Sequence, residues 1–76
     1  MEEKENILAQ REGRLLNLIL TVKEWQHADI QDVLLDMMTD IIVLCKSEGI
    51  SPYEIYRDGI GDYAYLTDDE SIFDEI

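Results

Sequence analysis

The sequence has 76 residues, the length of one small domain, and a chain of this size buries only about 60% of its unfolded surface. Its single cysteine, Cys45, has no partner for an internal disulfide, and its single histidine, His27, excludes a zinc site built from several Cys and His ligands. Eighteen acids against six bases give a net charge of −12, which argues against binding nucleic-acid phosphates or anionic lipid.

The chain opens on an acidic stretch, residues 1–5, with no apolar signal core behind it. Because no apolar run is long enough to cross a bilayer either, we expect a cytoplasmic protein. The first helix is predicted over residues 3–26, where apolar side chains recur at the spacing of one helix face. These side chains are Leu8, Leu15, Leu18, Ile19, Val22 and Trp25.

A second helix is predicted over residues 29–48. Asp29 is a competent N-cap for it, and at its end Gly49 suits the left-handed cap position while Ile50 packs back on the last turn. Neither Gly nor Pro lies in the junction between the two helices, so one continuous helix over residues 14–48 is the alternative. We favour a break and a helical hairpin, because a helix of that length is unusual in a globular domain.

A short third helix is predicted over residues 52–57. Ser51 and Glu54 have the spacing of a capping box, and Pro52 occupies the first helical position. Residues 58–62 are rich in Gly and Asp, which is typical of a turn.

The chain ends on a strongly acidic stretch. Residues 63–66 suit an extended segment, and residues 67–70 form a second potential capping box ahead of a last helical turn through Phe73. Residues 58–76 contain seven acids and no base. This region is too short and polar to hold itself together, so it must pack on the helices or stay mobile.

These elements predict an all-α fold: a two-helix hairpin, a short third helix and an irregular acidic C-terminal segment. Residues 1–57 are expected to form the helical core, and residues 58–76 the acidic segment. Both long helices have apolar faces wider than one neighbour covers. We therefore expect a homodimer that completes a helical bundle and adds the stability that a small core lacks.

The sharpest pattern is a row of aspartates on the second predicted helix. At about 100° per residue they fall within about 80° of one another, so they form a ridge of carboxylates about one turn apart. They are Asp29, Asp32, Asp36 and Asp40. The ridge is either the solvated face of an amphipathic helix, a row of charge spaced for a basic groove, or part of a metal site.

The metal interpretation comes from a resemblance. The run Asp29-Ile30-Gln31-Asp32-Val33-Leu34, an apolar helix and then Gly49-Ile50-Ser51 look like the final helices of the all-α nucleotide pyrophosphohydrolases of the MazG type, over about a third of the chain. In that family a Glu-x-x-Asp pair on this helix joins an upstream Glu-x-x-Glu pair to hold magnesium. Here Asp29 stands where the family has glutamate, and only Glu2 with Glu5 has the upstream spacing. The resemblance implies a degenerate nucleotide pyrophosphohydrolase as one alternative.

Other signs of catalysis are missing from the sequence. The serines lie in no nucleophile elbow, and His27 has no Cys or Ser at a catalytic spacing. We therefore expect no enzymatic activity, no cofactor and no metal, with His27 exposed at the junction between helices.

The C-terminal segment is the second candidate for recognition, because it intersperses acids with aromatic side chains. Such a segment suits docking on a partner, or imitation of the phosphates and bases of nucleic acid. The alternative is that its aromatic rings pack on the helices while its acids face water. The candidate partner-binding residues here are Tyr63, Tyr65, Asp68, Asp69, Glu70, Phe73, Asp74 and Glu75.

The function predicted from these patterns is that of a small acidic inhibitor or regulator. It would occupy a basic, nucleic-acid-binding site on a partner protein. Compact acidic inhibitors encoded by phages and mobile elements are the analogy for this function. No direct nucleic-acid or membrane partner is expected. The main alternative is a small adaptor or regulatory subunit that docks through apolar helix surface, with the acids serving solubility.

Overall fold

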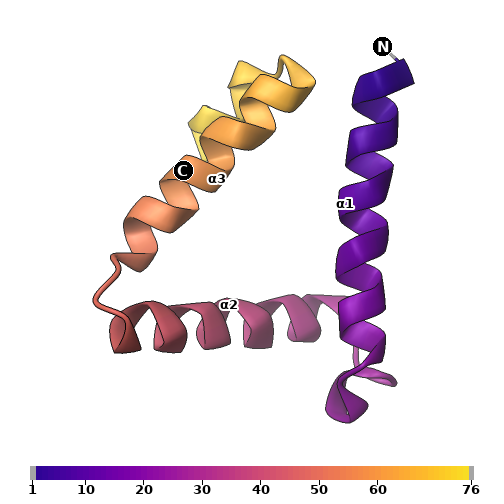
Figure 1. The fold of residues 1–76 in the computed structure, drawn as a ribbon, viewed down its shortest axis with the longest axis vertical. Helices are drawn as coiled ribbons and strands as arrows, with labels where there is room; N and C mark the ends of the chain where they lie inside the picture. The colour runs from indigo at the N-terminus through magenta and orange to yellow at the C-terminus, as the bar shows by residue number, and fades with distance from the viewer. Residues whose placement is uncertain (1, 76) are drawn as a thin grey trace. The chain divides into compact units, whose positions relative to one another are not determined.

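The structure is a computed structural model that describes residues 2–75 (Figure 1). It contains the helices α1 (Glu2–Leu20), α2 (Ile30–Ser47) and α3 (Pro52–Thr67), and the 3₁₀ helices η1 (Lys23–Trp25) and η2 (Glu70–Glu75). No strand occurs in residues 2–75, so the predicted all-α class is confirmed. The chain forms two compact units, and the boundary between them lies within α2, after Asp40.

In the first unit, α1 ends well before the predicted position. The Thr21 hydroxyl donates to the Leu18 carbonyl at 2.6 Å, and the Gln26 side-chain amide donates to the Leu20 carbonyl at 2.8 Å. These side chains satisfy carbonyls that a continuing helix would otherwise use. The predicted extension of the first helix to residue 26 is therefore wrong, and only the short η1 follows.

The junction before α2 also rules out the single long helix. Chain turns separate Leu20 from Ile30, with η1 between them. Asp29 caps α2 as predicted, because its carboxylate accepts a hydrogen bond from the Gln31 backbone N–H at 3.2 Å. The chain between residues 14 and 48 thus forms two separate α-helices, with η1 between them.

In the second unit, the end of α2 has the predicted geometry. Gly49 has a φ of 72°, in the left-handed region. Its N–H donates to the Lys46 carbonyl at 3.4 Å, and the Ile50 N–H donates to the Cys45 carbonyl at 2.8 Å. This pair of bonds is a Schellman motif, which satisfies two terminal carbonyls and reverses the chain toward α3.

Helix α3 begins as predicted and ends ten residues later than predicted, at Thr67 rather than residue 57. The Ser51 hydroxyl accepts from the Glu54 N–H at 3.3 Å, with proline at the first turn. Residues 58–66 are helical, so the predicted turn and extended segment are wrong. Ile60 and Ala64, one turn apart, are both buried, and this burial offsets the cost of the glycines beside Ile60.

The end of the chain is ordered by short-range hydrogen bonds. Asp68 is left-handed, with a φ of 56°, and ends α3. The Thr67 hydroxyl accepts from the Asp69 N–H at 3.3 Å, and the Asp69 carboxylate accepts from both the N–H and the hydroxyl of Ser71. The helical turn predicted through Phe73 is present as η2, which packs on α3. Asp69, rather than Thr67, caps it.

Few side chains of the described residues are buried. The first unit buries Ile19 and Val33, and the second buries Cys45, Ile60 and Ala64. Cys45 is 7% exposed, as expected of a small buried hydrophobe. No helix among residues 2–75 is both long and apolar enough to cross a membrane.

Candidate functional site

The predicted aspartates form one continuous surface on the first unit. This surface, called the acidic ridge, consists of Asp29, Asp32, Asp36 and Asp40, all exposed. The N-cap and the helix that follows it place successive members three or four residues apart on one side of α2. At 1.5 Å per residue the ridge extends over about 16 Å.

No base among the described residues pairs with the carboxylates of the acidic ridge. Among the residues that the structure describes, none of the four lies in an ion pair, and Asp29 alone accepts a hydrogen bond, from the Gln31 N–H. Like charges one turn apart repel and destabilise a helix by a few tenths of a kcal/mol per pair. The ridge is therefore a line of negative charge open to water and to any cationic partner.

The opposite side of α2 is apolar and exposed. Placing residues about 100° apart puts its centre roughly 160° from the centre of the ridge. We call this surface the α2 apolar stripe; it consists of Leu34, Leu35, Met38, Ile41 and Ile42. All five side chains are at least 42% exposed, and Leu35 reaches 66%. One helix thus presents a charged and an apolar surface back to back.

The two tyrosines predicted to bind a partner are not brought together. Both lie on α3, but they are two positions apart and so point to opposite sides of the helix. Tyr65 is 83% exposed, the highest value among the exposed large hydrophobic side chains of the described residues. Tyr63 is 42% exposed. Of the two, Tyr65 is the better placed to contact another molecule.

The remaining C-terminal candidates divide into structural and exposed residues. Asp68 terminates α3, and the half-buried Asp69 caps η2, so both have local structural roles. Glu70, Phe73, Asp74 and Glu75 are exposed on η2.

Helix α3 carries a second row of carboxylates, the α3 acidic row, which the sequence patterns did not predict. It consists of Glu54, Asp58 and Asp62, all exposed and each four residues from the next. The row exists only because α3 continues through the glycines. Asp58 also lies 3.8 Å from the Arg57 Nε in an exposed ion pair. The four-residue spacing was the available signal, but the predicted turn concealed it.

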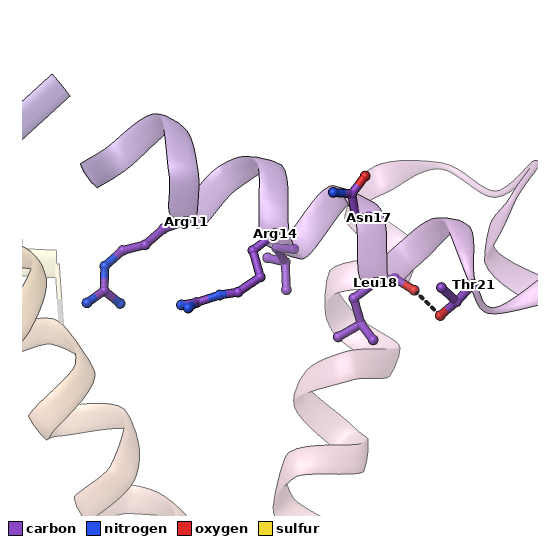
Figure 2. Close-up of a pocket in the computed structure, with 6 residues that line it drawn as sticks. Arg11, Arg14, Asn17, Leu18 and Thr21 are labelled. Atoms are coloured by element: carbon purple, nitrogen blue, oxygen red, sulfur yellow. Dashed lines mark hydrogen bonds between the residues drawn. The ribbon is translucent and has the colours of Figure 1, made fainter. Parts of the chain in front are cut away.

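A basic surface was missed as well. Figure 2 shows a groove along the C-terminal half of α1, where the side chains of Arg11 and Arg14 extend to the same side. This α1 groove has a volume of about 560 Å³. It is lined by Arg11, Arg14, Leu15, Asn17, Leu18 and Thr21. Arg11 and Arg14 are two of only six bases in the chain, and neither has an ion-pair partner among the described residues.

The His, Cys, Asp and Glu side chains that the structure describes include no group of three close enough to hold a metal ion. The side chain of Glu2, which the pyrophosphohydrolase resemblance pairs with Glu5, lies outside the described part. No protein-family model matches the chain, and neither the curated proteins nor the solved structures contain a significant match to it.

Proposed function

We propose that this chain is a small protein-binding protein whose acidic ridge docks on a basic, nucleic-acid-binding surface of a partner protein and so inhibits or regulates it. The observation that supports this proposal is the ridge itself: four exposed carboxylates on one side of one helix, none paired with a base among the described residues. A solubilising surface needs no alignment of its charges, and an aligned row repels itself.

The physical basis of such binding is electrostatic. A line of fixed negative charge attracts a cleft lined by Lys and Arg, and this attraction raises the association rate. Sites that bind nucleic-acid backbone are clefts of this kind. The α3 acidic row adds exposed carboxylates on the second unit, so the negative surface is not confined to one element. Direct binding to nucleic acid is disfavoured by the same charge.

The test is capture of partners by the tagged full chain, washed at low and at high salt, with mass-spectrometric identification. Charge-driven complexes weaken steeply as salt screens the interaction. We expect the proteins retained at low salt to be basic and nucleic-acid-binding, and to be lost at high salt. Retention of a partner that is neither basic nor salt-sensitive would contradict the proposal.

A second candidate function is favoured by the α2 apolar stripe. Its side chains are at least 42% exposed, and apolar surface of this kind marks interaction sites. A helical hairpin that pairs with a second copy, forming a four-helix bundle, would bury it. Alternatively an adaptor would dock another protein on it. Binding through this stripe would persist at high salt, which distinguishes it from docking through the ridge.

A further inference from the structure

The α1 groove combines two features that together specify the chemistry of its occupant. Arg11 and Arg14 place two unpaired guanidinium groups along it. Leu15 and Leu18 supply apolar wall, and they are 39% and 51% exposed. An occupant must therefore offer anionic groups, such as carboxylates, for the arginines and an apolar group for the leucines. An aromatic ring is especially suitable, because guanidinium groups also stack on aromatic faces.

One described segment of this chain has that chemistry. In a 3₁₀ helix residues three apart are eclipsed, so Phe73 and Glu70 share one edge of η2, and Asp74 lies on the next edge. Phe73 is 47% exposed, and both acids are exposed. The acidic ridge is less suitable than η2 as an occupant of the α1 groove. The one apolar residue near its line within residues 29–40, Val33, is buried at 1% exposure and cannot reach another molecule.

The length of η2 also matches that of the α1 groove. Six residues of 3₁₀ helix, Glu70–Glu75, extend over about 12 Å at 2.0 Å per residue. The groove from Arg11 to Leu18 extends over about 10 Å along α1, at 1.5 Å per residue. The two adjacent edges of η2 that carry Glu70, Phe73 and Asp74 are thus long enough to meet both arginines and the apolar wall.

We propose that the α1 groove binds the η2 segment of a second copy of this chain, with Glu70 and Asp74 facing Arg11 and Arg14, and Phe73 against Leu15 and Leu18. A second copy is named as the occupant because only five side chains are buried among the described residues, so the fold gains stability from association. If each copy donates its segment to the other, the assembly closes as a two-fold dimer. This inference is independent of the acidic ridge and goes beyond the proposed function.

The test uses two charge-reversed forms of the full chain. The first carries Arg11→Glu and Arg14→Glu, so its groove and its segment are both acidic. The second carries Glu70→Arg and Asp74→Arg, so its groove and its segment are both basic. Each alone should have a dimer dissociation constant raised about tenfold or more, measured by sedimentation equilibrium. An equimolar mixture should regain wild-type affinity as a heterodimer, because both interfaces then pair opposite charges.

A matched control carries Lys23→Glu and Lys46→Glu, which changes the net charge by the same amount outside the groove. This control should dimerise like the wild type. Circular dichroism must show helix content retained in each form. A monomeric wild type, a groove variant that still dimerises, or two folded variants that fail to associate when mixed would each overturn the proposal. A monomeric wild type would point to closure within one chain. A groove variant that still dimerises would point to a dimer held by apolar helix surface.

Discussion

At the scale of single residues, the local structure depends on a few side chains whose chemistry suits one position. Gly49 adopts a φ of 72° at the end of α2, where a residue with a Cβ is strained. Asp29 and Ser51 accept hydrogen bonds from backbone N–H groups that begin the next helix. These three positions set where α2 begins, where it ends and where α3 begins.

Replacing Gly49 with alanine should lower the free energy of unfolding by about 1 kcal/mol, because an L-residue in the left-handed region carries that cost. Nothing lies within 4 Å of a Cβ placed there, so steric contact adds no penalty. Urea unfolding followed by circular dichroism measures the change. An unchanged midpoint would mean that the Schellman motif does not form in solution.

At the scale of elements, the start of α3 could be predicted from the sequence, whereas its length could not. Its start was predictable, because Ser51, Pro52 and Glu54 form a local signal that needs no other part of the chain. Its continuation through Gly59 and Gly61 was not predictable. It depends on burial of Ile60 and Ala64, which is a tertiary effect and overrides local preference.

The candidate surfaces likewise differ in whether local sequence signals are enough to predict them. The acidic ridge was predicted residue by residue, because its spacing lies on a helix with clear termini. The α3 acidic row was missed, because it requires a helix where local residues indicate a turn. The α1 groove was missed for a different reason: Arg11 and Arg14 are inconspicuous in a sequence dominated by acids, and only their placement beside Leu15 and Leu18 makes them a surface.

Because α3 is helical through Gly59 and Gly61, alanine at these positions should change the stability in the opposite direction to alanine at Gly49. Gly59→Ala and Gly61→Ala should each raise the free energy of unfolding by about 0.5–1 kcal/mol, since glycine inside a helix is destabilising relative to alanine. The Cβ at each has nothing within 4 Å, as at Gly49, so backbone conformation alone sets the sign. Destabilisation by either substitution would indicate a turn at residues 58–62.

The ridge gives a further prediction for α2. Asp36 lies one turn from both Asp32 and Asp40, so Asp36→Asn removes two repulsive pairs. The variant should be more stable by a few tenths of a kcal/mol at low salt, and the gain should fade as salt is added. Urea unfolding of the wild type and the variant at two salt concentrations measures this difference in stability. A loss of stability would show that Asp36 makes a favourable contact.

At the scale of the whole molecule, the small number of buried side chains is the dominant fact. Five side chains are buried among the described residues, all of them apolar. A core of this size supplies little stability, while the α2 apolar stripe and the α1 groove remain uncovered. We therefore expect both surfaces to take part in association, with a second copy or with another protein.

If association stabilises the fold, the thermal midpoint must depend on concentration. A tenfold increase in protein concentration should raise the Tm by roughly 3–5 °C for a dimer of chains this size. Circular dichroism melts at several concentrations measure this directly. A Tm that does not change with concentration would mean that the monomer is stable alone.

The most direct test of the central claim compares partner capture by two variants that change the same amount of charge. One replaces the four ridge aspartates with asparagine, which also preserves a capping side chain at residue 29. The other replaces Glu3, Glu5, Glu12 and Glu24 with glutamine, four exposed acids outside the ridge. We predict that the ridge variant, shown by circular dichroism to keep its helices, loses the basic partners that the wild type and the glutamine variant retain at low salt. Equal capture by both variants would contradict the account, because charge at the ridge would then have no specific role in binding.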